Sequence, residues 1–69
     1  MRGESTKAAM RYAAEHGHYA RTCNIAREAL RQDTSEAYSR AAHEIAHNSL
    51  GSEYGVVVDA ARDALRNDR

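Results

Sequence analysis

The segment His43-Glu44-Ile45-Ala46-His47 has the residue types and the spacing of the zinc-binding helix of a metallohydrolase. Residues four apart on an α-helix project from the same face, so the two imidazoles could share one zinc ion at about 2.1 Å. Glu44 would then polarise a zinc-bound water as the general base. The segment therefore defines one alternative, a zinc-binding protein that could act as a minimal metallohydrolase.

The ligand set of such a site is incomplete in this sequence. Hydrolytic zinc needs a third protein ligand and an open fourth position. Glu53 could join His43 and His47 as that ligand, and folding could also bring in His16 or His18. Enzymes of this kind also bind their substrate in a cleft between two subdomains, which a short helical chain does not provide. We therefore expect no enzyme, no catalytic residue and no cofactor, and zinc remains the alternative.

The length of the chain limits the core that can position any site. Its 69 residues form one domain, residues 1–69, and a chain this short buries only about 60% of its unfolded surface. It has no Phe or Trp, and its only cysteine, Cys23, has no partner for an internal disulfide. A free thiol suits a reducing cytoplasm. Because small domains without disulfides often gain stability by association, we expect a protein partner or a homo-oligomer, with a homodimer as the simplest form.

The charge of the chain does not indicate a nucleic-acid or membrane partner. Ten basic and ten acidic residues give a net charge of zero, and no apolar run approaches the roughly 18 residues of a membrane span. The excess of Arg over Lys is typical of a GC-rich bacterial or phage genome. Four arginines define a second alternative, a regulator that contacts nucleic acid, although acidic residues interleave them. They are Arg21, Arg27, Arg31 and Arg40.

The pattern of apolar residues and helix-capping residues predicts an all-α fold of four short helices, because Pro is absent and Ala, Arg and Glu favour helix. The first should run from about 5 to 16, with Ser5 or Thr6 as its cap and Gly17 at its end. The second carries an apolar stripe and stops at 32–33. Thr34 or Ser35 should cap the third, which runs to about 49. The fourth should open at 52–53.

The second and fourth predicted helices repeat one another. Residues 18–33 align without a gap on residues 53–68, and Tyr19 falls on Tyr54 at an offset of 35 residues. The match continues at Ala26/Ala61, Arg27/Arg62, Ala29/Ala64, Leu30/Leu65, Arg31/Arg66 and Asp33/Asp68. A repeat of this length indicates two related helical hairpins.

The repeated segment resembles the second half of a tetratricopeptide repeat, whose period is about 34 residues. That pattern has a Gly, a Tyr two places on, small residues facing the partner helix, and Ala-Leu before an Asp-Pro turn. These places are taken by Gly17, Tyr19, Thr22, Ala26, Ala29, Leu30 and Asp33. Thr34 stands where the turn proline would be. The resemblance implies two tandem helix-turn-helix hairpins, about 5–33 and 35–68, either TPR-like or a small bundle.

The same resemblance implies a binding surface. In that family the first helices of the hairpins line a groove that binds peptides, often through carboxylates. With a slip of one residue in the second hairpin, Lys7 and Arg11 correspond to His43 and His47. These four would form a basic, pH-sensitive stripe, unless they are simply a solvated face. The sequence thus predicts a small non-catalytic interaction module, an adaptor or regulator that binds a partner or itself.

Overall fold

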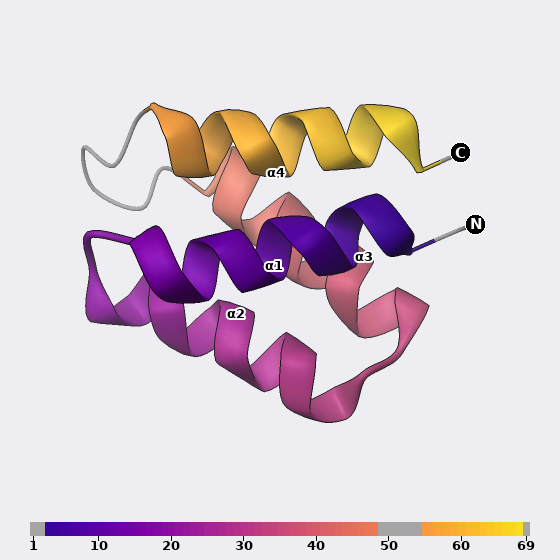
Figure 1. The fold of residues 1–69 in the computed structure, drawn as a ribbon, viewed down its shortest axis with the longest axis horizontal. Helices are drawn as coiled ribbons and strands as arrows, with labels where there is room; N and C mark the ends of the chain where they lie inside the picture. The colour runs from indigo at the N-terminus through magenta and orange to yellow at the C-terminus, as the bar shows by residue number, and fades with distance from the viewer. Residues whose placement is uncertain (1–2, 49–54, 69) are drawn as a thin grey trace.

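The computed structural model describes residues 3–48 and 55–68, and they form four α-helices of similar length (Figure 1). These are α1 (Glu4–His16), α2 (Ala20–Gln32), α3 (Ser35–His47) and α4 (Val56–Asn67). Throughout these described ranges the regular structure is helical. The predicted all-α class with four short helices is therefore confirmed.

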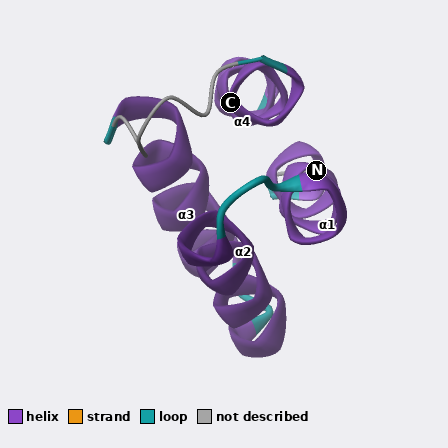
Figure 2. Ribbon diagram, turned by 90° about the vertical axis from the view of Figure 1, so that its left-hand side faces the viewer, coloured by secondary structure: helices purple, strands orange, loops and turns teal. Residues whose placement is uncertain are grey.

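Helix α1 lies between α2 and α4, and α3 crosses behind these three (Figures 1 and 2). Both α1 and α3 pack against all the other helices, whereas α2 and α4 make no packing contact with each other in the described part. Since α4 runs back along α1 in the opposite direction, the two ends of the described chain lie side by side (Figure 1). The four helices thus close into one bundle.

Alanine dominates the buried core. Met10 and Ile45 are the largest fully buried apolar side chains, and Thr6 and Thr22 are buried with them. Most of the remaining core positions are alanines that face one another across the helix pairs. Small side chains let the helix backbones approach closely, but each contributes little apolar area. The core is compact and thin.

Two predicted helix boundaries are confirmed. Gly17 follows the last residue of α1, and a Cβ atom at this position would lie 2.7 Å from the carbonyl oxygen of Ala13. Only glycine fits there without a backbone shift, because real Cβ atoms do not approach so closely. Thr34 caps α3, where its side-chain oxygen accepts a hydrogen bond of 3.1 Å from the backbone N–H of Ala37.

The predicted cap of the first helix is wrong. Gly3, with a φ of 94°, occupies the cap position of α1 and has no side chain, while the Thr6 hydroxyl donates to the carbonyl of Gly3. The free N–H groups are satisfied from the other end of the chain. Asp68 accepts from the backbone N–H of Ser5 at 3.2 Å and from that of Thr6 at 2.8 Å. A local sequence pattern cannot reveal a cap that is contributed 62 or 63 residues away.

The third and fourth helices differ from prediction at their adjoining ends. Helix α3 ends at His47, before the expected 49, and α4 begins at Val56, after the expected 52–53. Gly55, with a φ of 113°, is the cap residue that directly precedes α4. Residues 49–54, which include the predicted helix-ending Gly51 and the predicted start of the fourth helix, lie outside the described residues.

The internal repeat is visible in the packing of α2 and α4. Both helices end at equivalent positions, Gln32 and Asn67. Buried positions coincide at the same offset of 35 residues, and so do two surface ion pairs. The coincidences are Thr22/Val57, Ala26/Ala61 and Ala29/Ala64 in the core, and Glu28–Arg31/Asp63–Arg66 on the surface. The hairpins themselves differ, because residues 17–19 join α1 to α2 whereas the longer 48–55 joins α3 to α4.

Candidate functional site

Lys7 of the predicted binding stripe is engaged in contacts within the chain. Its ammonium lies 3.4 Å from a carboxylate oxygen of Asp33 and 6.0 Å from the centre of the Tyr38 ring. Arg11, one helical turn further along α1, is exposed and acts electrostatically on the same carboxylate. Lys7 therefore joins α1 to the turn between α2 and α3.

Asp33 and Tyr38 form the centre of this cluster. Asp33 follows α2 in the left-handed conformation, with a φ of 54°, and accepts a hydrogen bond from the hydroxyl of Tyr38. That hydrogen bond, followed by the contact with Lys7, lowers the pKa of Asp33, and the same bond raises the pKa of Tyr38. The Asp33 carboxylate is thus occupied by the Tyr38 hydroxyl and the Lys7 ammonium, and these contacts hold the α2–α3 turn in place.

His43 and His47 lie on the exposed side of α3, as predicted for residues four apart. Their rings stack with centroids 5.5 Å apart and planes 26° apart. Within residues 3–48 and 55–68, no group of three or more His, Cys, Asp or Glu side chains is placed to hold a metal ion. Glu53, the predicted third ligand, falls outside the described residues. The pair supplies two of the nitrogen donors that zinc prefers.

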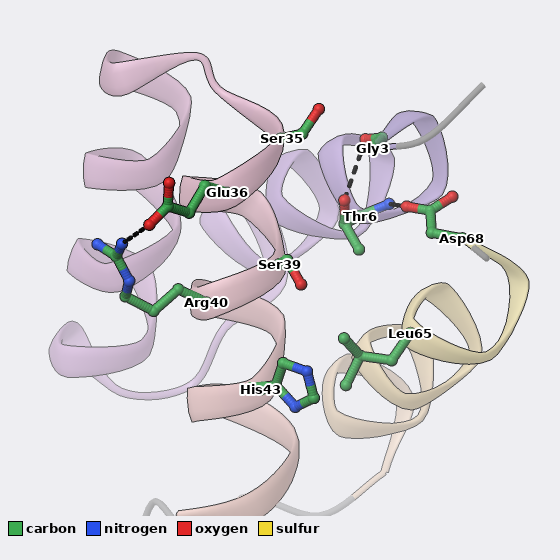
Figure 3. A pocket seen from close by; sticks show the side chains of 9 residues that line it. All are labelled: Gly3, Thr6, Ser35, Glu36, Ser39, Arg40, His43, Leu65 and Asp68. Atoms are coloured by element: carbon green, nitrogen blue, oxygen red, sulfur yellow. Dashed lines mark hydrogen bonds and ion pairs between the residues drawn. The ribbon is translucent and has the colours of Figure 1, made fainter.

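A pocket of about 530 Å³ lies where the beginnings of α1 and α3 meet the end of α4 (Figure 3). Most of its lining residues are polar, and Leu65 is the one large apolar side chain among them. The lining residues are Gly3, Thr6, Ser35, Glu36, Ser39, Arg40, His43, Leu65 and Asp68. His43 points toward Leu65 across this pocket (Figure 3), while neither Lys7 nor Arg11 lines it. The four residues of the predicted stripe therefore do not share this pocket.

The pocket brings together a serine, a histidine and an aspartate without connecting them for nucleophilic catalysis. Both oxygens of Asp68 accept hydrogen bonds from the first turn of α1. Among the described side chains, no hydrogen bond joins His43 to Ser39 or to Asp68. A catalytic serine needs a histidine that is itself oriented by a third group. This geometry supplies polar contacts for a ligand, and Ser39 is not activated by His43.

A second depression of about 680 Å³ runs between α2 and α3, and we call it the α2–α3 groove. Ala29, Ala37 and Ala41 contribute small side chains to it, and charged residues of both signs stand around them. The full lining is Arg21, Asn24, Ile25, Glu28, Ala29, Gln32, Ala37, Arg40, Ala41 and Glu44. Sequence reasoning missed this groove. Its one sequence signal is the i, i+4 spacing of Ala37 with Ala41 beside Arg40 with Glu44.

The groove also separates the parts of the predicted zinc motif. Glu44 lines the α2–α3 groove, whereas His43 lines the pocket on the other side of α3. Consecutive residues of a helix project about 100° apart, which places the two side chains toward different depressions. Glu44 is therefore not directed into the pocket that His43 lines.

Two of the four arginines of the nucleic-acid alternative are paired with carboxylates. Arg31 contacts Glu28 at 2.6 Å and Arg40 contacts Glu36 at 2.8 Å, both as exposed pairs along one helix. Each pair cancels its own charge locally. A phosphate backbone is bound through clustered, uncompensated positive charge, which these two arginines do not provide.

Comparison with models of known protein families, with curated proteins and with solved structures finds no match to this chain. No described helix has both the length and the apolar content that crossing a membrane requires. The function must therefore be argued from the surfaces of the helical bundle.

Proposed function

We propose that this chain is a small non-catalytic protein-interaction module that binds through the face formed by α2 and α3. The observation that carries the proposal is the α2–α3 groove, a depression of about 680 Å³ between two helices. Small residues line it where a bound helix or extended segment would approach, and charged side chains stand beside them. Interfaces of this kind combine an apolar centre with a polar rim.

The composition of the groove supports recognition of protein and not of a small metabolite. Ala29, Ala37 and Ala41 leave space above the helix backbones, and half-buried Ile25 adds an apolar side chain at the same face. A helix of a partner could pack closely here, because small residues let two helices approach. Around these residues, charges of both signs would fix the orientation of the partner.

The module is similar to a pair of tetratricopeptide hairpins in its repeated second helices. The burial pattern that α2 shares with α4 supports this similarity. The contact of α4 with α1 departs from a simple stack of hairpins, since it brings the chain ends together. We therefore propose two related hairpins closed into a bundle, acting in the cytoplasm of a bacterium or phage-infected cell as an adaptor or regulator.

Site-specific photo-crosslinking tests this proposal with a control that the repeat itself provides. Asn24 is exposed and lines the groove, whereas its repeat equivalent, Asp59, is exposed on α4 and lies outside the groove lining. A photoreactive residue at Asn24 should give a protein adduct of defined mass in cells. The same group at Asp59 should not give that adduct. Identical adducts from both positions, or none from Asn24, would contradict the proposal.

Zinc binding is the second candidate, because the exposed imidazoles of His43 and His47 stack side by side on the same face of α3. It is tested by metal analysis of dialysed protein and by melting with and without added zinc. A zinc site predicts a stoichiometric metal and a zinc-dependent rise in Tm that His43→Ala abolishes. His18→Ala should retain that rise, because among the described residues His18 does not join His43 and His47 in a group that could hold a metal. If zinc leaves the Tm of the parent unchanged, no such site exists.

A further inference from the structure

We infer that the α2–α3 groove binds the same groove of a second copy of this chain, forming a two-fold symmetric dimer. This inference rests on the proposed function and names its partner. The argument comes from the arrangement of four charged residues around the groove. They are Arg21 and Glu28 on α2, and Arg40 and Glu44 on α3.

The two helices present these charges in alternating positions. Helix α2 runs toward the turn at residues 33–34 and α3 runs away from it. On α2 the positive Arg21 lies far from the turn and the negative Glu28 lies nearer to it. On α3 the order is reversed, with negative Glu44 far from the turn and positive Arg40 nearer. Neighbouring corners of the groove therefore carry opposite charges, and diagonal corners carry like charges.

Such an alternating pattern is complementary to a copy of itself. A two-fold axis along the groove places α2 of one copy over α3 of the other, so that Arg21 faces Glu44 and Glu28 faces Arg40. A two-fold axis across the groove places each helix over its own copy in reverse, and Arg21 then faces Glu28 while Arg40 faces Glu44. Either packing brings opposite charges together, and each contact occurs twice, as an isologous interface requires.

The residues between these charges allow the two faces to meet. Ala29, Ala37 and Ala41 form a low floor that is already almost fully buried, so they permit close approach but add little new burial, whereas half-buried Ile25 would gain burial in the contact. No buried side-chain polar atom of the described part lacks a hydrogen-bond partner, so docking does not have to satisfy one. Glu28 and Arg40 are already paired within their own helices, with Arg31 and Glu36, and these exposed pairs are weak enough to exchange for contacts across the interface.

The small size of the face indicates a weak, reversible dimer. A helix of 13 residues is about 20 Å long, so a face two helices wide covers about 400 Å² on each copy. The total of about 800 Å² is smaller than the roughly 1,200–2,000 Å² buried in stable complexes. It falls among the areas buried in weak, transient encounters. We therefore expect a reversible dimer that forms in the range of roughly tens to hundreds of micromolar.

Two sets of charge reversals test the dimer. Arg21→Glu with Arg40→Glu makes the four charges all negative, and Glu28→Lys with Glu44→Lys makes them all positive. Each double variant alone should self-associate about tenfold more weakly or worse, because like charges then face one another. An equimolar mixture of the two should form a heterodimer, measured by sedimentation equilibrium. Circular dichroism of each variant checks that its helices are intact.

The matched control is Arg27→Glu with Arg62→Glu, an equal change of charge at exposed, repeat-equivalent positions outside the groove lining. It should dimerise like the parent. The inference is overturned if the parent remains monomeric at about 1 mM, if the control weakens association as much as the groove variants, or if the mixture fails to associate. If a folded variant pair cannot be obtained, Asn24→Arg at the groove should weaken association, and Asn67→Arg on α4, an equal change of charge outside the groove lining, should not.

The crosslinking result separates failure of the dimer from failure of the proposed function. A monomeric parent whose Asn24 position still crosslinks to a different protein overturns the dimer and supports the interaction module. A monomeric parent without any crosslink from Asn24 contradicts both. A crosslinked adduct of twice the monomer mass, containing this chain alone, supports both.

Discussion

Helices α2 and α4 are each followed by an aspartate, Asp33 and Asp68, and these equivalent residues make different contacts. Asp33 ends α2, remains largely exposed, and binds Lys7 and the hydroxyl of Tyr38. Asp68 follows α4, is partly buried, and accepts from the backbone N–H groups of Ser5 and Thr6. Both carboxylates reach α1, because α1 lies between the two repeated helices. A duplicated sequence thus gives α1 one side-chain ion pair from Asp33 and one helix cap from Asp68.

The difference teaches that repeated residues keep their place in the helix but not their partners. The buried faces of α2 and α4 coincide because each helix must pack against α1 and α3. The ends of the two helices are less constrained. Asp33 is followed by a tight turn into α3. Asp68 instead lies beside the first turn of α1, whose own cap residue, Gly3, has no side chain.

Enlarging equivalent core alanines should give the largest effect and show how alike the two packings are. Ala26 and Ala61 are almost completely buried, at 0% and 1% exposure. Leucine at either position would overpack its helix seam and lower the free energy of unfolding by about 1–3 kcal/mol. Urea unfolding followed by circular dichroism measures the loss. Similar losses would support equivalent packing, and a loss at only one position would show that the repeat is not structural.

Replacing Asp68 by Ala should give the next largest effect. The variant leaves the first N–H groups of α1 without their acceptor, which costs about 1 kcal/mol, the usual cost of a lost helix cap. Asp33→Asn is the comparison, because asparagine tolerates the left-handed conformation of residue 33 and keeps an oxygen that can accept from Tyr38. It removes mainly the exposed ion pair with Lys7 and should cost less. The two midpoints in urea provide the comparison. A larger loss for Asp33→Asn would reverse our assignment of the two roles.

The sequence predicted the parts of this fold that depend on local chemistry. Thr34 was identifiable as a cap and Gly17 as a helix end, because both act on neighbouring backbone groups. The repeat was visible as an alignment, and its buried positions follow from helical periodicity. The cap from Asp68 was not predictable, since it depends on how α4 packs along α1.

The candidate site was harder to predict for the same reason. The resemblance to a known repeat directed attention to Lys7, which the fold pairs with Asp33 across two helices. The α2–α3 groove depends on how closely and at what angle α2 and α3 pack, and the spacing of residues within one helix does not determine that packing. His43 and Glu44 are neighbours in sequence, yet they line different depressions on the two sides of α3.

Acid should affect both aspartates, and Asp68 provides the cleaner test. Partial burial raises the pKa of Asp68, but the hydrogen bonds from Thr6 and then Ser5 outweigh it and lower the pKa overall. A carboxyl with a lower pKa in the folded state binds fewer protons there than in the unfolded chain. Its stabilisation is therefore present above the unfolded pKa of about 4 and is lost as the pH falls through the folded pKa.

Asp68→Asn should accordingly flatten the loss of stability below about pH 4. The measurement is the free energy of unfolding from urea titrations between neutral and acidic pH. Asp33→Asn should also flatten the curve, since the pKa of Asp33 is lowered by the Tyr38 hydroxyl and by Lys7. If the Asn variants lose stability in acid as steeply as the parent, neither hydrogen-bonded carboxylate controls the acid response.

Tyr38→Phe should give the smallest change and isolate one contact of the Asp33 cluster. The ring stays buried in the core, and only the hydroxyl that donates to Asp33 is lost. Without that donor the pKa of Asp33 should rise toward its ordinary value, while Lys7 still holds it below. Carbon NMR of the Asp33 carboxyl during an acid titration measures this shift, and the Asp68 carboxyl in the same spectra serves as the internal control. Because Asp68 has no contact with Tyr38, its titration should stay unchanged. Equal movement of both carboxyls would mean that the substitution disturbs the whole bundle and not one hydrogen bond.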